Sequence, residues 1–405
     1  MIKRFSWLLL GLAVVIVLPN MAAAQTELVV WHAYRGMEKN AFEKVVAMFN
    51  QERVDDIMVK PLAVPYDAYA DKITAAVPRK KGPDVFIFAQ DRLGGWVEAG
   101  NTMEPIDFYI DDETLEKFIP TTMEAMVYQG NTYGLPVNYK VVTMIYNKAL
   151  VQTPPRTSSE LVAVAKPLSN ANAGKFGLAY SYSDFYYHSA LMNAFGGGVF
   201  KGNRDPKLNR PENIQSLDLM MQWFDKDQIL PAEPSSSLIT ALFNQGDAAI
   251  VFSGPWFLSE IKDGMDFGLA TLPTIDEAGG APMKPWMTVE GAYISAPSQH
   301  KDEAYDFVHF LTGIEAGKVM ALEGRQTPAN MNVYDDVEVA NDATLSAFRA
   351  QVENALPMPN YAEMTMVWSP ATTAMNSIVR KAASPKAAMD QAQKDVEERV
   401  QSLRK

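Results

Sequence analysis

The chain has 405 residues, a formal net charge of −12 and no cysteine. The lack of cysteine excludes a disulfide framework, a thiolate metal site, a cysteine nucleophile and lipid attachment at a cysteine. The negative charge disfavours nucleic acid or an anionic membrane as a partner. Because the chain exceeds the roughly 250–300 residues at which a single hydrophobic core stops growing, two domains are expected.

The first residues have the pattern of an export signal. Two basic residues precede an apolar stretch over 7–18, which is shorter than the ~20 residues that a permanent membrane-spanning helix needs. Ala22 and Ala24 fit a small-residue cleavage site. We expect residues 1–24 to be a cleaved signal peptide, with an uncleaved anchor as the alternative, and the mature protein to be periplasmic and not a lipoprotein.

Strands and helices alternate along the rest of the chain. Apolar runs and helical periodicity predict strands at 28–31, 57–59, 84–89, 141–146, 248–252 and 292–295, and helices through 42–49, 69–76, 214–224, 303–311 and 385–396. A capping box from Thr157 to Glu160 begins another helix. This alternation predicts an α/β fold with largely parallel, doubly wound sheets and at least two domains.

The sequence contains none of the familiar motifs for catalysis or for metal or cofactor binding. The four histidines lack the HExxH or any other ligand spacing, and no phosphate loop, nucleophile elbow or dinucleotide motif occurs. The run Gly196 to Gly198 follows a helix-like segment and is interpreted as a turn. We therefore predict no catalytic residue, metal or cofactor. A glycoside hydrolase stays open, because carboxylate pairs cannot be excluded among 48 acidic residues.

Aromatic and charged residues gather just after the predicted strands. In doubly wound folds ligands bind beyond the carboxyl ends of the strands. The residues at these places include Tyr34, Arg35, Phe88, Asp91, Arg92, Asp184, Tyr186, Trp256 and Trp368. The faces of a sugar ring stack on aromatic rings, and its hydroxyls bind carboxylates and guanidinium groups. The mixture therefore favours a saccharide ligand.

Several short motifs, in this order and spacing, resemble a known family. They are Leu-Val-Val-Trp at 28–31, Gly-Pro-Asp-Val-Phe-Ile-Phe-Ala-Gln-Asp-Arg-Leu-Gly-Gly at 82–95, Ile-Tyr-Asn-Lys at 145–148, Ser-Gly-Pro-Trp at 253–256 and Met-Pro-Asn at 358–360. The chain resembles the maltose/maltodextrin-binding group of the family 1 extracellular solute-binding proteins, which serve ABC transporters. The resemblance spans nearly all of the mature chain.

The resemblance implies a two-lobed periplasmic binding protein fold of type II, with a ligand cleft between discontinuous lobes joined by a hinge. It implies an N-terminal lobe at 25–139 plus 292–337, a C-terminal lobe at 143–287 plus 342–405, and hinge crossings at 140–142, 288–291 and 338–341. One ligand per monomer is expected.

The resemblance also assigns roles to individual residues. Asp91 and Arg92 match the polar pair that binds sugar hydroxyls, and Tyr186, Trp256 and Trp368 match the stacking rings. The departures from the family pattern are Asp184 in place of a glutamate, Phe88 in place of a tryptophan, Tyr34 and Arg35 in place of an Asp-Lys pair, Lys140 in place of a glutamate, and Ser369 in place of a second aromatic residue.

The expected function is binding of maltose or maltodextrin and its delivery to the membrane subunits of the transporter, without an enzymatic step. Because Arg35 and Lys140 replace acidic groups, an acidic or decorated oligosaccharide, or a phosphorylated polyol, is the alternative ligand.

Overall fold

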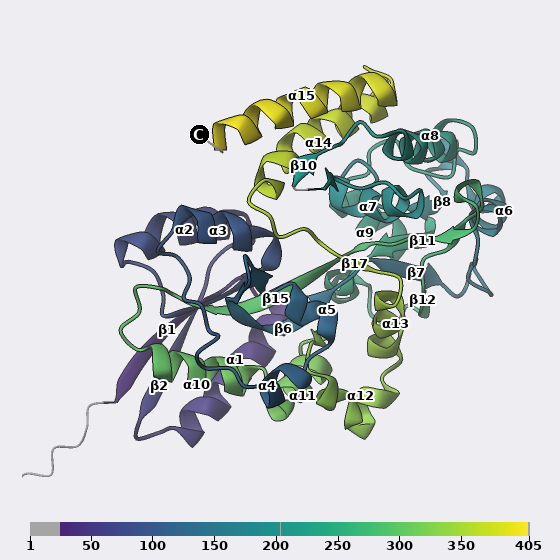
Figure 1. The fold of residues 1–405 in the computed structure, drawn as a ribbon. Helices are drawn as coiled ribbons and strands as arrows, with labels where there is room; N and C mark the ends of the chain where they lie inside the picture. The colour runs from purple at the N-terminus through teal and green to yellow at the C-terminus, as the bar shows by residue number, and fades with distance from the viewer. Residues whose placement is uncertain (1–24, 203, 404–405) are drawn as a thin grey trace, which may run out of the picture.

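The computed structural model describes residues 25–202 and 204–403. Two β-sheets, which lie side by side in Figure 1, divide these residues into two lobes, here called the N-lobe and the C-lobe. The predicted signal peptide, residues 1–24, lies outside the described residues. In both lobes strands and helices alternate along the chain, which confirms the α/β class predicted from the sequence.

The N-lobe is built on a mixed sheet with the strand order β16-β6-β15-β3-β1-β2, and β17 pairs with β15. Its strands are β1 (Thr26–His32), β2 (Ile57–Ala63), β3 (Val85–Ala89), β6 (Gly134–Lys140), β15 (Trp286–Ile294), β16 (Thr327–Pro328) and β17 (Leu356–Pro357). Every residue of β3 is buried, as expected of a strand covered by helices on both faces. A short ribbon of β4 (Val127–Tyr128) and β5 (Asn131–Thr132) stands beside this sheet.

Helices cover the N-lobe sheet with the apolar faces that the sequence predicts. Phe42, Val45 and Phe49 of α1 are buried together, because residues three and four apart share one face of a helix. The helices and 3-10 turns of this lobe are α1 (Gly36–Glu52), α2 (Tyr66–Ala76), η1 (Val77–Arg79), η2 (Gln90–Arg92), α3 (Leu93–Ala99), α4 (Asp112–Glu116), α5 (Pro120–Glu124), α10 (Lys301–Leu311), α11 (Ile314–Leu322) and η6 (Met331–Asp335).

The C-lobe is built on a smaller sheet with the strand order β12-β7-β11-β8. Its strands are β7 (Thr143–Asn147), β8 (Phe176–Ala179), β11 (Ala248–Ser253) and β12 (Phe267–Ala270), with outer ribbons β9 (Phe200–Lys201) with β10 (Asp205–Pro206), and β13 (Thr274–Ile275) with β14 (Ala281–Pro282). Its helices and 3-10 turns are α6 (Ser158–Leu168), η3 (Ala171–Ala173), α7 (Phe185–Ala194), α8 (Pro211–Asp225), α9 (Ser236–Gln245), η4 (Pro255–Glu260), η5 (Asp276–Ala278), α14 (Met364–Val379) and α15 (Pro385–Leu403).

Half of the predicted capping box at α6 forms as expected. The Thr157 hydroxyl accepts a hydrogen bond from the backbone N–H of Glu160 over 3.2 Å, which is the N-cap bond. The Glu160 carboxylate accepts from the backbone N–H of Arg156 over 2.7 Å, one residue before the position that a capping box requires. The sequence therefore predicts the start of this helix correctly.

The prediction of largely parallel sheets is wrong. β1 pairs in parallel with β2 and β3, and β8 with β11, but β15 runs antiparallel to β3 and β6, and β7 runs antiparallel to β11 and β12. Parallel pairing follows from right-handed β-α-β crossovers within one lobe. β15 enters the N-lobe sheet from the C-lobe, without such a crossover, and can therefore pair antiparallel with its neighbours.

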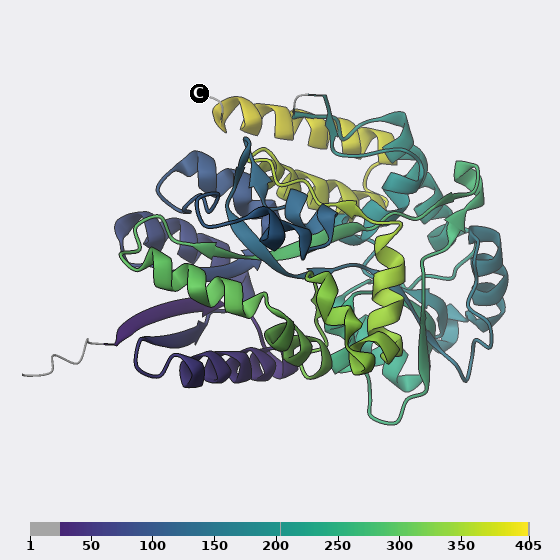
Figure 2. The same cartoon turned by 60° about the horizontal axis from the view of Figure 1, so that its bottom comes forward.

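Within the described residues the chain passes between the lobes in three places. β6 leads through Val141 and Val142 into β7, and β15 begins with Trp286 in the C-lobe core and ends in the N-lobe sheet. The third passage contains α12 (Val337–Asn341) and α13 (Ala343–Val352), which lie at the front beside the junction of the lobes in Figure 2. The lobe boundaries given above to the residue remain predictions.

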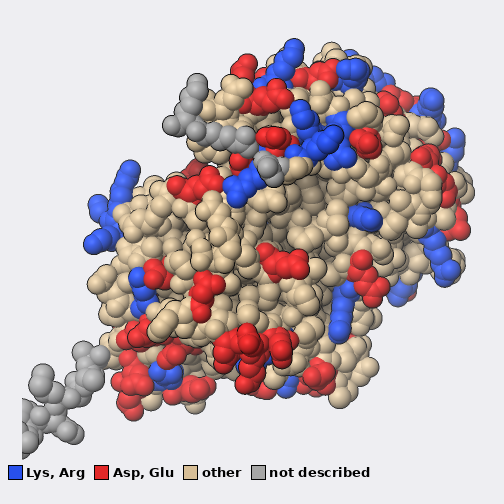
Figure 3. All heavy atoms as spheres, in the orientation of Figure 1, with Lys and Arg blue, Asp and Glu red and all other residues tan. Residues whose placement is uncertain are grey.

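The lobes also touch away from these passages. Arg204, at the β9–β10 ribbon of the C-lobe, donates to the Tyr128 hydroxyl of the N-lobe over 2.8 Å and forms an ion pair with Glu98 of α3 over 3.1 Å. The charged side chains are unevenly spread over the face in Figure 3, where acidic groups gather over the lower part of the N-lobe and basic groups are frequent along the right-hand edge of the C-lobe.

Candidate functional site

Asp91 and Arg92 come directly after the buried strand β3, on the 3-10 turn η2. The side chain of Gln90 holds this turn in place: it donates to the backbone oxygens of Met287 and Met358 over 3.3 and 3.2 Å and accepts from the N–H of Val289 over 2.8 Å. Arg92 Nε lies 3.2 Å from Asp91 Oδ2. The N-lobe therefore presents a carboxylate and a guanidinium group on a turn fixed to β15, the strand that passes between the lobes.

Asp91 faces the C-lobe across the junction. The residue is 6% exposed, and burial raises the pKa of its carboxyl to about 6, although Arg92 and the indole of Trp368 on α14 act in the opposite direction. Trp368 packs edge-on against Trp286, with ring centroids 5.8 Å apart. The polar pair of the N-lobe and this C-lobe indole, both predicted from the sequence, thus meet in the structure.

The C-lobe contributes a group of partly exposed aromatic rings. Tyr186 stands near the start of α7, and its ring centroid lies 6.2 Å from that of Trp256 on η4. Tyr187 packs edge-on against both rings, and its hydroxyl accepts from Trp256 Nε1 over 3.2 Å. The Tyr186 hydroxyl accepts from Thr288 of β15 over 3.3 Å. The structure brings Tyr186 and Trp256 together, as the sequence predicts, and adds Tyr187.

Asp184 caps the helix that carries Tyr186. Its Oδ1 accepts from the backbone N–H of Tyr186 over 2.8 Å, which fixes the carboxylate at the positive end of α7. Burial by the surrounding protein raises the pKa of Asp184, and the hydrogen bond from Tyr186 opposes this. Its predicted contact with a ligand stays a prediction.

Lys140, at the end of β6, is held by two carboxylates. Its Nζ lies 3.0 Å from Glu290 of β15 and 3.3 Å from Glu38 of α1. Burial alone would lower the pKa of the ammonium group, but Glu290 and Glu38 outweigh it and raise the pKa. The three side chains together carry a net charge of −1, so Lys140 does not make the site basic.

The other predicted N-lobe residues are placed differently. Tyr34 is 4% exposed, packs among His32 and Phe42, and accepts from Asn138 Nδ2 over 3.3 Å. Phe88 is also 4% exposed. Neither ring can stack on a ligand in this arrangement, because both are covered by the N-lobe core. Arg35 is exposed at the N-cap of α1, and its predicted contact with a ligand stays a prediction.

Sequence reasoning missed residues that the structure brings to the same place. Tyr66, the first residue of α2, is 56% exposed, although the protein around it and the carboxylates of Asp91 and Glu290 raise the pKa of its phenol to about 12. An exposed ring with protein on several sides is expected at the wall of a cleft. We call Tyr66, Asp91, Arg92, Lys140, Glu290, Tyr186, Trp256 and Trp368 the interlobe site.

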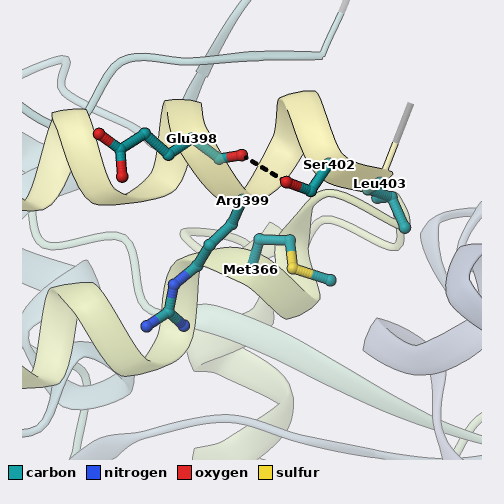
Figure 4. A pocket seen from close by; sticks show the side chains of 5 residues that line it. All are labelled: Met366, Glu398, Arg399, Ser402 and Leu403. Atoms are coloured by element: carbon teal, nitrogen blue, oxygen red, sulfur yellow. Dashed lines mark hydrogen bonds between the residues drawn. The ribbon is translucent and has the colours of Figure 1, made fainter. Parts of the chain in front are cut away.

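Other features of the described residues offer weaker candidates. A hollow between α14 and α15, shown in Figure 4, is lined by Met366, Glu398, Arg399, Ser402 and Leu403, and no aromatic ring faces it. In residues 25–202 and 204–403 no group of three or more histidine, aspartate or glutamate side chains could hold a metal ion. Over the same residues, no helix is long and apolar enough to cross a membrane.

Three relatives resemble the chain over most of its length. A maltotriose-binding protein of Pyrococcus abyssi is 33% identical over 364 residues, which cover 87% of this chain and 78% of that protein. A galactooligosaccharide-binding protein of Bacillus subtilis is 27% identical, with 91% and 88% covered. A maltooligosaccharide ABC transporter solute-binding lipoprotein of Streptococcus pneumoniae is 28% identical, with 74% and 72% covered.

The fold agrees with a solved structure of the same kind. A cyclo/maltodextrin-binding protein in complex with maltotetraose superposes with a TM-score of 0.83 and 30% identity, and the match covers 93% of this chain and 98% of that one. The family described as bacterial extracellular solute-binding protein matches residues 35–318. The predicted two-lobed binding-protein fold and the predicted resemblance are thereby confirmed, and the chain belongs to the bacterial extracellular solute-binding proteins.

Proposed function

We propose that the protein binds a maltooligosaccharide between its lobes and delivers it, chemically unchanged, to an ABC transporter. The observation that carries the proposal is the meeting of the buried Asp91, which is paired with Arg92, with the indole of Trp368 across the lobe junction. Tyr186 and Trp256 add a second pair of C-lobe rings. The names of the maltotriose-binding and maltooligosaccharide-binding relatives support the same ligand class.

The chemistry of each half of the site fits a glucosyl chain. The rings of Tyr186, Trp256 and Trp368 offer faces for the apolar C–H surface of the sugar. Asp91 accepts hydrogen bonds from hydroxyls and Arg92 donates them, and bonds to charged partners are roughly twice as strong as neutral ones. A ligand that touches both lobes stabilises their closed arrangement by the difference in its affinity for the two states.

The remaining parts of the proposal concern partners and place. The family relation supports docking of the closed form on the membrane subunits of a transporter, and a monomer is sufficient for the interlobe site. With the export signal predicted at residues 1–24, we place the protein in the periplasm. The chain has no cysteine to which a lipid could be attached, whereas the Streptococcus pneumoniae relative is named a lipoprotein.

Isothermal titration calorimetry tests the ligand class. The purified protein is titrated with maltose, maltotriose, maltotetraose, a galactooligosaccharide and a trisaccharide of uronic acids. We expect the maltooligosaccharides to bind with micromolar or lower Kd, and the uronate to bind at least tenfold more weakly. Tighter binding of the uronate or of the galactooligosaccharide would replace the proposed ligand.

The same samples separate binding from hydrolysis. After prolonged incubation with a maltodextrin, we expect chromatography to recover the sugar intact. Release of shorter products in step with protein concentration, and not in a sample of the Asp91→Asn variant, would indicate a glycoside hydrolase instead.

A further inference from the structure

Tyr66 lies at the start of α2, at the edge of the N-lobe core, where its ring is partly exposed to solvent. Pro65, with φ −54° and ψ 135°, ends the extended segment that follows β2, and Tyr66 opens α2. Residues three apart lie on the same face of a helix. Tyr69, one turn later, is fully buried, whereas Tyr66 is 56% exposed. The face of α2 that packs on the core is therefore buried at Tyr69 and exposed to solvent one turn earlier, at Tyr66.

A stack of rings supports Tyr66 from behind. Phe88 of β3 lies parallel to Tyr69, with centroids 4.7 Å apart and an interplanar angle of 3°. The ring of Tyr66 follows at 5.1 Å from Phe88, tilted by 33°. Because Phe88 is 4% exposed, Tyr66 covers the outer end of the stack. One side of the Tyr66 ring is thus fixed by packing, while the residue as a whole stays 56% exposed.

The phenol of Tyr66 lies among the polar groups of the interlobe site. Asp91 and Glu290 act to raise its pKa, and Lys140 and Arg92 act to lower it. Across the junction, Tyr66 in turn contributes to the raised pKa of Tyr186. Interactions of this kind require proximity, so the Tyr66 phenol lies near these charged groups of the N-lobe and near the phenol of Tyr186 in the C-lobe.

We propose that Tyr66 is the stacking platform of the N-lobe, against which one pyranose ring of the ligand packs opposite the aromatic rings of the C-lobe. The inference rests on the proposed function and identifies the residue that forms the N-lobe side of the binding site. It also assigns Phe88 a supporting role: Phe88 holds Tyr66 in place and does not touch the sugar.

The assignment specifies the ligand more closely. A flat ring recognises a sugar face made of C–H groups, as in a glucopyranose whose hydroxyls all point outward along the equator. Enclosure of such a ring between Tyr66 and the C-lobe rings requires contact with both lobes at once. The closed state is then stabilised by stacking as well as by hydrogen bonds.

Calorimetry with maltotriose tests the platform on four variants. Tyr66→Ala removes the ring, Tyr66→Leu keeps an apolar cover over Phe88 without an aromatic face, and Tyr66→Phe keeps the face without the hydroxyl. Phe108→Ala is the matched control, because Phe108 is a 93% exposed aromatic residue of the same lobe that packs against Tyr109, next to α10. Circular dichroism and thermal melting of each variant verify that it is folded.

We expect Tyr66→Ala and Tyr66→Leu to raise the Kd for maltotriose about tenfold or more, as loss of a stacking ring does elsewhere. Tyr66→Phe should stay within about threefold of the unmodified protein, and Phe108→Ala should not change the Kd. An unchanged Kd in the folded Tyr66→Leu variant, or equal losses in Tyr66→Phe and Tyr66→Ala, would overturn the stacking role. Failure of the unmodified protein to bind maltotriose would instead refute the proposed function.

Discussion

The ionisation of Asp91 is expected to make sugar affinity depend on pH. Burial raises the pKa of this carboxyl to about 6 in the unliganded protein. The ionised carboxylate accepts hydrogen bonds from hydroxyls more strongly than the neutral acid does. The ligand should therefore prefer the ionised form, and affinity should fall as the pH drops through about 6.

The size of the effect follows from the fraction of molecules that are ionised. About one pH unit below the pKa, roughly a tenth of the carboxyl groups are ionised, so the apparent Kd rises about tenfold, or by roughly 1.4 kcal/mol. Calorimetric titrations with maltotriose near pH 5 and near pH 7.5 measure this difference. Asp91→Asn, which cannot ionise, should bind more weakly at neutral pH and show little dependence on pH.

The same shift in pKa has the opposite sign for the stability of the unliganded protein. The pKa of Asp91 rises from 3.8 to about 6 on folding, so the folded chain holds this proton more tightly than the unfolded chain. The stability from this group is present below about pH 4 and is lost as the pH rises through about 6. Asp91→Asn should therefore raise the free energy of unfolding near pH 7.5, by at most about 3 kcal/mol, since the ion pair with Arg92 is lost as well.

Two results would refute this reasoning. One is a Kd for maltotriose that is equal near pH 5 and near pH 7.5. The other is a pH dependence that survives in Asp91→Asn, which would assign the titration to another group of the interlobe site. A gain in thermal stability together with a loss of affinity in Asp91→Asn is the pattern expected when a site keeps a costly buried charge for binding.

Three further predictions concern stacking, the hinge charges and the packing of the C-lobe. Trp256→Ala and Trp368→Ala should each weaken maltotriose binding by about 1–3 kcal/mol, measured by calorimetry. Trp223→Phe is the control: Trp223 lies in the fully buried core, so this variant should lower the melting temperature without changing the Kd. Lys140→Met leaves two partly buried carboxylates unpaired and should lower the free energy of unfolding in urea by about 3 kcal/mol, and adding Glu290→Gln should recover part of it. Gly177→Ala would place a Cβ 2.1 Å from the backbone oxygen of Ala165 and should lower the free energy of unfolding in urea by about 1–3 kcal/mol. Gly95→Ala is the control: its Cβ would lie 3.6 Å from the nearest atom, so this variant should leave the free energy of unfolding unchanged or raise it.

The residues that the sequence predicted for the site share a local signal. Asp91 and Arg92 follow a strand of five buried residues, and Trp256 follows another buried strand, β11, so a rule about strand ends finds them. Their meeting with Trp368 on α14 depends on the third passage between the lobes. That meeting could be predicted from the family resemblance but not from periodicity, because no local pattern encodes which distant segments pack together.

Tyr66 was missed because the second strand was predicted too short. The apolar run predicts a strand that ends at Val59, because Lys60 and Pro61 interrupt the run, but β2 continues to Ala63 at the edge of the sheet. An edge strand tolerates a charged residue and a proline, because one of its sides has no neighbouring strand to bond. The same rule about strand ends, applied after Ala63, would have led to Tyr66.

Glu290 was missed for a related reason. The sequence predicts a strand at 292–295, whereas β15 begins at Trp286, so Glu290 falls before the predicted strand, in the segment 288–291 expected to be a hinge crossing. A carboxylate within a buried strand is stable when a partner is close, and Lys140 on the neighbouring strand β6 lies 3.0 Å away. The partner is remote in the sequence, and so the strand could not be recognised from its own residues.

The ion pairs of Lys140 with Glu38 and Glu290 also bear on the charge of the ligand. Considered alone, Arg35 and Lys140 suggested a basic cleft and an acidic saccharide. In the structure Lys140 is shared by Glu38 and Glu290, and Arg92 lies beside Asp91. These five side chains are three carboxylates and two cations, which gives a net charge of −1. An anionic sugar would meet net repulsion there, whereas neutral hydroxyls can bond to both kinds of group. The electrostatics of the assembled site therefore favour a neutral oligosaccharide, which no single substitution in the sequence would reveal.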